Sequence, residues 1–346
     1  MAQINKPTDY FNTVLYTGDG ANSRAITGVG HQPDLVWFKN RTGATAYHHQ
    51  LHDSVRGATQ GALYSSLDNG EDTSYGISSF DSDGFTLRNP SHDSQNASGY
   101  TFASWNWLSG GTASSNTDGS ITSSVSANTT SGFSIVSYTG NGTSGATVGH
   151  GLGVVPSMII VKKRDSQNNW GVYHQGIGNG NALYLDTTSA TVDSTAFWND
   201  TTPTSTVFSL GDSATVNGSG GSYIAYCFSE VKGFSKFSSY VGNGSSSGSF
   251  IYTGFKPSWV MFKSSSTTGG WEIHDNKRDT FNPSDKRLFP NLNNVEASED
   301  YVDFLSNGFK FRTTDANGNT SGTSYIYMCF AESPLVGTNN IPATAR

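Results

Sequence analysis

One seven-residue pattern occurs three times and constrains the fold more than any other feature of the chain. It begins with proline, continues through β-branched, aromatic and aliphatic residues, and ends on lysine, at residues 33–39, 156–162 and 257–263. Proline cannot donate to a sheet ladder and suits the first residue of a strand. The run that follows is apolar on both alternating faces, which is typical of a strand buried between two layers. We expect each copy to be a central strand whose final lysine marks where it reaches the surface.

Two further columns frame each copy of this strand. A Tyr-x-Gly-Asx-Gly motif opens each copy, and a second tyrosine introduces its closing strand, at Tyr16 and Tyr100, Tyr138 and Tyr223, and Tyr240 and Tyr325. The paired tyrosines are 84, 85 and 85 residues apart. Such equal spacing in a diverged sequence indicates tandem units of one fold.

Short apolar runs bounded by Gly, Asn, Asp and Ser, without a sustained helical period, predict an all-β protein. We expect three tandem antiparallel β-sandwich domains, lectin-like or jelly-roll-like, of about 100 residues each. The predicted domains are residues 1–108, 132–231 and 232–346, and a Ser/Thr/Gly-rich linker at residues 109–131 has almost nothing to bury. The Asn-Gly and Asp-Gly pairs of the opening motif predict type I′ hairpins.

Composition and charge argue against several classes of function. Charged residues make up 14% of the chain and the formal net charge is −7, whereas a nucleic-acid partner requires a basic patch. No apolar run approaches the roughly 18 residues that span a bilayer, and no signal peptide is visible, so we expect synthesis in the cytoplasm without membrane insertion. Cys227 and Cys329 hold equivalent places in separate copies, so we expect buried thiols and no disulfide.

Motifs for catalysis, metals or cofactors are weak. The three histidines and the aspartate within residues 48–53 resemble a metal cluster, but only His48 aligns with a histidine in the other copies, which favours structural histidines. The acidic runs at residues 68–72 and 81–84 lack the complete calcium-binding loop and are typical of turns. No acidic column is shared and no Gly-x-Ser-x-Gly elbow occurs, so we expect neither an enzyme nor a cofactor.

Ligand contacts are expected where the three copies differ. The differing loops are residues 48–53, 191–206 and 275–287, which place charged and aromatic side chains among polar neighbours. Tryptophans at expected strand ends or in polar loops either stack on sugar rings, pack against other proteins or form pillars of the core, and they are Trp105, Trp107, Trp170, Trp198 and Trp271. The candidate ligand-binding residues are His49, His52, Asp53, Trp198, Asp275 and Arg278.

Several stretches resemble a family of tail-fibre-like virion proteins from marine bacteriophages. The resemblance covers essentially the whole chain and is carried by residues 9–18, 26–30, 33–41, 53–57, 120–128, 149–153, 254–260 and 330–334. It brings no catalytic residues with it.

The resemblance implies a non-enzymatic structural protein of a phage virion, a tail fibre or spike that contacts the host cell surface. A capsid decoration or knob protein is the alternative, and a polysaccharide depolymerase is a second one. The implied partners are other virion proteins, further copies of the chain in a trimer by analogy with appendages, and a host surface glycan.

Overall fold

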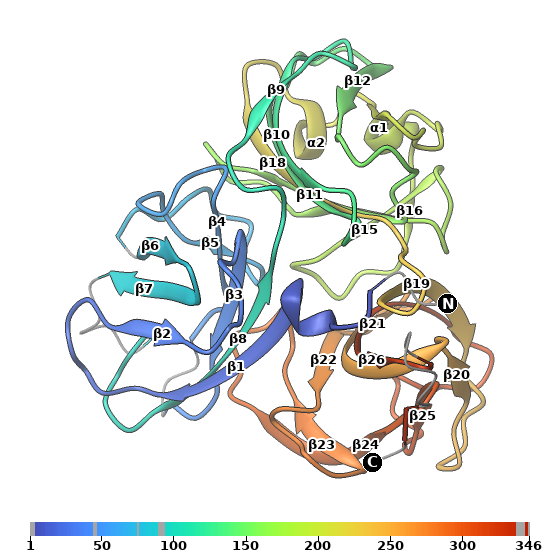
Figure 1. Cartoon of the computed structure of the whole chain (residues 1–346). Helices are drawn as coiled ribbons and strands as arrows, with labels where there is room; N and C mark the ends of the chain where they lie inside the picture. The colour runs from blue at the N-terminus through green and yellow to red at the C-terminus, as the bar shows by residue number, and fades with distance from the viewer. Residues whose placement is uncertain (1–3, 44–46, 75, 89–93, 337–342, 345–346) are drawn as a thin grey trace.

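The computed structural model describes residues 4–43, 47–74, 76–88, 94–336 and 343–344. This part of the chain is nearly all β, with strands in several antiparallel sheets, two single-turn helices and one 3-10 turn, η1 (Pro7–Asp9). Each sheet of the described residues draws its strands from one of three consecutive segments, which we call the first (β1–β8), second (β9–β18) and third (β19–β26) segment. Figure 1 shows them as three lobes around a common centre.

The first segment contains two facing sheets, one in the order β1-β8-β3-β4-β5 and one in the order β2-β7-β6. Apolar side chains from both sheets, among them Val36, Phe38 and Phe85, are buried together between them. Its strands are β1 (Phe11–Thr17), β2 (Ala25–Thr27), β3 (Leu35–Asn40), β4 (Gln50–Asp53), β5 (Leu63–Tyr64), β6 (Gly76–Asp81), β7 (Gly84–Arg88) and β8 (Thr101–Trp107).

The second segment has a sheet in the order β16-β15-β14-β13-β18-β11-β10-β9 and a two-stranded sheet, β12-β17. The core between them contains Ile159, Val161 and Phe208, together with Trp198 and Val216 from the two short helices. Its elements are β9 (Ser114–Asn116), β10 (Ser123–Asn128), β11 (Phe133–Thr139), β12 (Ala146–Gly149), β13 (Met158–Lys163), β14 (Gly171–His174), β15 (Asn181–Tyr184), β16 (Val192–Asp193), α1 (Thr195–Trp198), β17 (Val207–Leu210), α2 (Ala214–Asn217) and β18 (Ser222–Phe228).

The third segment has sheets in the orders β19-β26-β21-β22 and β20-β25-β24-β23. Val260, Phe262 and Phe309 are buried between them. Its strands are β19 (Ser235–Val241), β20 (Phe250–Tyr252), β21 (Phe255–Ser264), β22 (Trp271–Asp275), β23 (Ser284–Arg287), β24 (Ala297–Leu305), β25 (Gly308–Phe311) and β26 (Ser324–Pro334).

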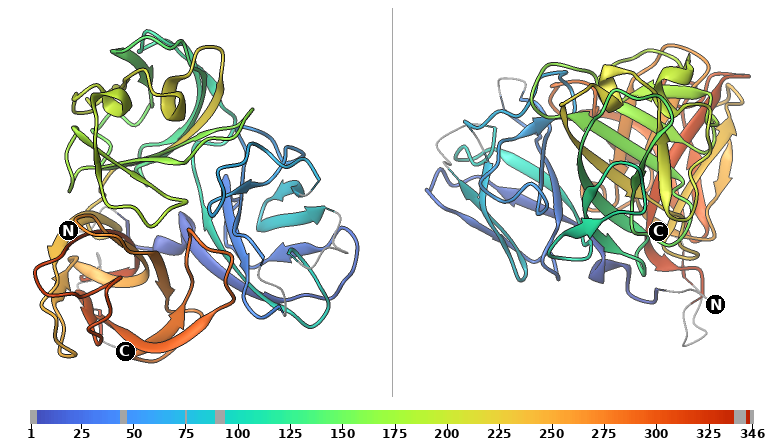
Figure 2. Two further views of the ribbon diagram at one scale, coloured as in Figure 1. Left: turned by 180° about the vertical axis from the view of Figure 1, so that it is seen from behind. Right: turned by 90° about the horizontal axis from the view of Figure 1, so that it is seen from above.

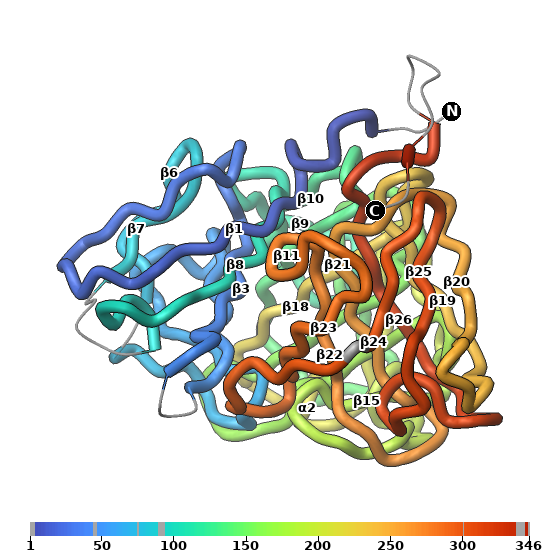
Figure 3. Tube along the Cα trace, turned by 90° about the horizontal axis from the view of Figure 1, so that it is seen from below, coloured from blue at the N-terminus to red at the C-terminus, as the bar shows by residue number. Residues whose placement is uncertain are grey.

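A further core lies at the centre of the molecule, where the largest sheet of each segment presents its other face. Trp107, Phe228 and Phe330 hold the same register position in β8, β18 and β26. Their ring centroids lie 5.7 to 6.4 Å apart, so each ring contacts the other two. Figure 2 shows the lobes enclosing this centre from behind. The turn η1 extends from the first lobe to β26 of the third and adds a further tie between them (Figure 3).

The three repeated apolar runs form β3, β13 and β21, and each is an interior strand of its sheet, as predicted. Their alternation serves two cores. In β3, Val36 and Phe38 contribute to the core of the first segment, whereas Leu35 and Trp37 contribute to the central core. A strand in this position has no solvent-facing side, which explains why neither face is polar.

The ladders correct the alignment of the closing strand. The opening tyrosine of each segment pairs with Phe102, Tyr223 or Tyr325, so Phe102 and not Tyr100 is the counterpart of the later tyrosines. Residue type suggested the wrong match because two aromatic residues lie two positions apart, a shift that leaves a side chain on the same face. Both cysteines are buried and free, as expected.

Residues 109–131, which we expected to be a linker, contain β9 and β10. β10 pairs with β11 along its whole length, and Ile121 and Val125 are buried in the second segment's core. A few apolar residues suffice here, because β10 obtains its remaining stabilisation from ladder hydrogen bonds to β11 on one side and β9 on the other.

The opening turns are also not the two-residue hairpins that we predicted. After the turn at Gly142 the chain crosses to the opposite sheet as β12, and the Gly142 amide donates to the carbonyl of Asn217 over 2.8 Å.

Candidate functional site

The repeated lysines cross the boundaries between segments, which we call the seams. Each Nζ atom donates to a backbone carbonyl of another segment: Lys39 to Asn293 (3.3 Å), Lys162 to Asp68 (2.8 Å) and Lys263 to Thr188 (3.4 Å). The first segment thus reaches the third, the second reaches the first, and the third reaches the second. The contacts close a ring.

These lysines do not mark the surface, contrary to our prediction. All three side chains are fully buried. Burial lowers the pKa of Lys39 to about 7 and those of Lys162 and Lys263 to about 8. The sequence suggested exposure because lysine is almost never fully buried without a partner, and here the partners are carbonyl groups that only the tertiary structure supplies.

The seam between the first and third segments contains a buried network of charges. Arg41 binds Glu296 over 2.7 Å, and the other oxygen of Glu296 lies 3.1 Å from Arg278. Arg278 also binds Asp275 over 2.6 Å, and Asp275 accepts a hydrogen bond of 3.0 Å from the indole of Trp105. The Arg278 guanidinium contributes to lowering the pKa of the Asp275 carboxyl against the opposing effect of burial.

The seam between the first and second segments repeats this arrangement with different residues. Arg164 binds Glu71 over 3.0 Å, and Glu71 lies 2.7 Å from Arg56. Arg56 binds Asp53 over 2.5 Å, and Asp53 accepts a hydrogen bond of 2.8 Å from the hydroxyl of Tyr226. Both of these seams therefore contain the same chain of ion pairs, Arg–Glu–Arg–Asp, with an aromatic side chain that donates a hydrogen bond to the aspartate.

Among the described residues, the seam between the second and third segments contains no such network. Ladder register places His174 where the other segments have Asp53 and Asp275. Ile177, three positions later, packs against the central core. His174 Nε2 lies 3.1 Å from the carbonyl oxygen of Tyr327, and burial lowers its pKa to about 4. Replacing a buried ion pair by well-packed apolar groups is often neutral for stability, so the ring tolerates this substitution.

All six predicted ligand-binding residues are buried and serve the scaffold, so they form no surface site in this structure. Asp53, Asp275 and Arg278 belong to the seam networks described above. His49 Nδ1 accepts a 3.0 Å hydrogen bond from Trp37, and His52 stacks on Phe38 at 5.6 Å. Trp198 packs edge-on against Tyr173. The remaining tryptophans considered as stacking platforms, Trp105, Trp107, Trp170 and Trp271, are core residues as well.

The histidine column proposed from the sequence was misaligned. His52 lies opposite Val36 as His274 lies opposite Val260, so His52 and not His48 is the counterpart of His274. Within the residues described, no group of three or more histidine, cysteine or acidic side chains is arranged to hold a metal ion. In the acidic run at 81–84, residues 82–83 form the turn between β6 and β7, as expected, and the Asp83 carboxylate accepts hydrogen bonds from the amides of Gly28 and Gly30.

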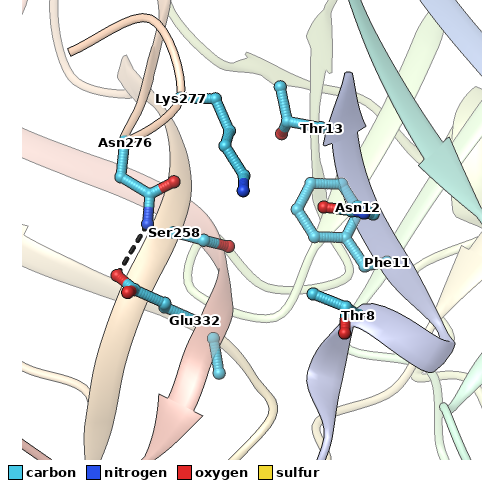
Figure 4. Close-up of a pocket in the computed structure, with 9 residues that line it drawn as sticks. Thr8, Phe11, Asn12, Thr13, Ser258, Asn276, Lys277 and Glu332 are labelled. Carbon is cyan, nitrogen blue, oxygen red and sulfur yellow. Dashed lines mark hydrogen bonds between the residues drawn. The ribbon is translucent and has the colours of Figure 1, made fainter. Parts of the chain in front are cut away.

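A small cavity lined by both polar and apolar groups opens at the seam between the first and third segments (Figure 4). We call it the Thr13–Asn276 cavity, and its volume is about 60 Å³. The first segment contributes Thr8, Phe11, Asn12 and Thr13, and the third contributes Ser258, Asn276, Lys277, Ala331 and Glu332.

Two buried polar atoms of this cavity lack a hydrogen-bond partner within the described chain: Thr13 Oγ1 and Asn276 Oδ1. The amide nitrogen of Asn276 is occupied, because it donates to Glu332 over 2.7 Å. In Figure 4 the Lys277 side chain points toward the space between Asn276 and Phe11. Leaving buried polar atoms unsatisfied costs about 1–3 kcal/mol each, so the site favours an occupant with hydrogen-bonding groups.

The cavity arises where the threefold repetition fails. Ser54, Gln175 and Asn276 are equivalent, since each donates its backbone amide over 2.8 Å to the carbonyl at the start of its central strand. In the neighbouring seam the longer side chain of Gln175 donates to the carbonyl of Phe237. Phe237 and Thr13 share a register position. At the seam between the first and third segments both positions hold a smaller residue, Asn276 and Thr13. The cavity is the space that the larger pair occupies at the neighbouring seam.

Sequence reasoning missed this site. Asn276 and Lys277 lie in the segment 275–287 that differs among the copies, but Thr13 belongs to an unremarked strand. A register-based alignment would have shown threonine opposite asparagine where the neighbouring seam has phenylalanine opposite glutamine.

Comparison with known proteins places the chain in one family. The model of a domain of unknown function (DUF7483) matches residues 6–334. Neither a curated protein nor a solved structure matches the chain. No helix of the described residues is long and apolar enough to cross a membrane.

Proposed function

The chain belongs to the DUF7483 family, and we propose that it is a non-enzymatic structural protein of a bacteriophage virion. In this proposal it forms a tail fibre, spike or similar appendage that contacts the host cell surface. It is made in the cytoplasm of the host and resides on the particle, bound to other virion proteins.

The observation that supports this proposal best is the closed ring of three similar segments around one apolar centre. We propose that each segment is one of three tandem β-sandwich domains, since each has its own core between two sheets. Such a ring gives every domain two neighbours. It therefore suits an exposed particle protein that must stay folded without disulfides, since both cysteines are free.

The buried ionisable groups support a structural role and not catalysis. Asp53, Arg56, Asp275 and Arg278 all form buried ion pairs at the seams, where loss of one partner would leave the other charge buried and unpaired. Perturbed ionisable groups are common in active sites, but structural ion-pair networks perturb pKa values as well. Here the groups with shifted pKa values, Arg56, Asp275 and Arg278, lie at the seams and are held in ion pairs.

Immunogold labelling of intact phage particles whose genome encodes this protein tests the proposal. We expect label at the tail or its appendages. Uniform label over the head would support a capsid decoration protein instead, and the absence of label from particles that contain the protein's gene would refute a virion role. Incubation with host polysaccharide that releases new reducing ends would show a depolymerase.

The homotrimer implied by analogy is a separate part of the proposal. One chain already supplies three domains around a centre, so the ring itself needs no second copy. Sedimentation equilibrium distinguishes a particle of 36.9 kDa from one of about three times that mass.

A further inference from the structure

We propose that the Thr13–Asn276 cavity binds neighbouring hydroxyl groups of a terminal sugar residue in a host surface glycan. The inference rests on the proposed function, because it names the ligand class through which the appendage would contact the cell. Its chemistry can nevertheless be tested on the purified protein alone.

The first argument is the pattern of hydrogen-bonding groups. Asn276 Oδ1 requires a donor, and Thr13 Oγ1 can accept or donate. The exposed Lys277 ammonium points toward the same space and can donate to an acceptor there. A hydroxyl group is both donor and acceptor, so two adjacent hydroxyls satisfy all three groups at once.

The second argument is charge. The cavity wall contains one cation, Lys277, and one anion, Glu332, whose oxygens already contact Asn276 and Lys256. An anionic ligand would meet the Glu332 carboxylate, and a cationic ligand would meet Lys277. A neutral ligand is repelled by neither group, so the cavity favours a polyol over a phosphate, a carboxylate or a metal ion.

The third argument is size and surface. A single water molecule requires about 10–15 Å³ of cavity volume. The 60 Å³ present therefore accommodates a hydroxylated fragment of two or three carbon atoms. The Phe11 ring lines the cavity and supplies an apolar surface for the C–H groups of such a fragment. Lys277 is exposed and Thr8 is half-buried, so the rest of the sugar can remain in solvent.

The comparison with the neighbouring seam provides the decisive variant. Asn276→Gln restores the longer side chain that closes the equivalent place through the Gln175 bond to Phe237. We expect this variant to fill the cavity and raise the thermal midpoint while sugar binding falls at least tenfold. Because the change stabilises the protein, loss of binding cannot be attributed to unfolding.

Binding is measured by saturation-transfer difference NMR and titration with the methyl glycosides of glucose, galactose and mannose, and with glycerol as the smallest probe. Thr13→Val keeps the shape but removes the hydroxyl, and Lys277→Met removes the ammonium. We expect each to weaken binding three- to tenfold. The matched controls are Thr139→Val on an exposed strand end and Lys310→Met, and both should bind like the parent.

The outcomes separate the two proposals. No signal from any probe would mean that the cavity holds water only, and the inference fails. Equal binding by the parent and Asn276→Gln would place the sugar elsewhere, and the inference fails while the proposed function stands. Binding that depends on Asn276, together with no label on particles, would support the site and refute the virion role.

Discussion

Trp105 in β8 donates its indole N–H to the Asp275 carboxylate in β22 over 3.0 Å, although 170 positions separate them in the chain. The same carboxylate binds Arg278. One buried acid thus connects the first and third segments and neutralises a guanidinium that has no access to water. The corresponding contact at the next seam joins Tyr226 to Asp53.

Asp275→Asn tests the strength of this connection. We expect the free energy of unfolding to fall by about 3–5 kcal/mol, because Arg278 keeps its buried charge and loses one of its anionic partners. Urea unfolding followed by tryptophan fluorescence measures the loss. Glu230→Gln is the control, since it removes a partly exposed ion pair with Lys236 that contributes less than about 1 kcal/mol. Equal losses in the two variants would contradict a special role for the seam.

The buried lysines predict that stability rises from neutral to alkaline pH. The folded-state pKa values of about 7 to 8 lie below the 10.5 of an ordinary lysine, so the unfolded chain binds more protons across this window. We expect the unfolding free energy to increase by at least about 2 kcal/mol between pH 7 and pH 10. Above pH 10 the free energy of unfolding should fall again. Burial raises the pKa of Tyr223 to about 12, so the folded chain then binds more protons than the unfolded chain.

Lys39→Met is the variant that isolates this effect. It removes the group with the lowest lysine pKa, so its stability should change less with pH than that of the parent. Urea midpoints in a series of buffers supply the comparison, with Lys310→Met as the surface control. A parent protein whose stability is flat or falls between pH 7 and pH 10 would contradict the prediction.

From two buried histidines we predict how the free energy of unfolding changes at acid pH. Burial lowers the pKa of His52 to about 3 and that of His174 to about 4, whereas both titrate near 6.5 when unfolded. The unfolded chain therefore binds more protons below pH 6.5, and stability is lost as the pH falls from there toward 4. His52→Phe preserves the stacking on Phe38 and should reduce the acid slope in thermal unfolding. An unchanged slope would show that other groups dominate.

The reactivity of the two cysteine thiols tests whether the cores of the second and third segments stay closed to solvent. Cys227 and Cys329 are fully buried, and burial raises the pKa of both thiols, so the reactive thiolate is scarce. We expect no reaction of the folded protein with a thiol-specific chromogenic reagent at neutral pH. Two thiols per chain should react in guanidinium chloride. Reaction of the native protein within minutes would indicate that the cores open locally.

The sequence by itself determined the all-β class, the three central strands and the faces of their side chains. Period-two alternation in an apolar run is a local property, and it is sufficient to place Val36 and Trp37 on opposite sides of β3. The exposure of Lys39 and the pairing of Asp275 with Trp105 are not local, because they depend on which segment lies across the seam. Only the tertiary structure decided that the three segments close into a ring, since desolvation and partner carbonyls come from residues far apart in the chain. The Thr13–Asn276 cavity follows for the same reason. Neither side chain is unusual in its own segment, and the two leave space between them only because the tertiary structure places them opposite each other across the seam.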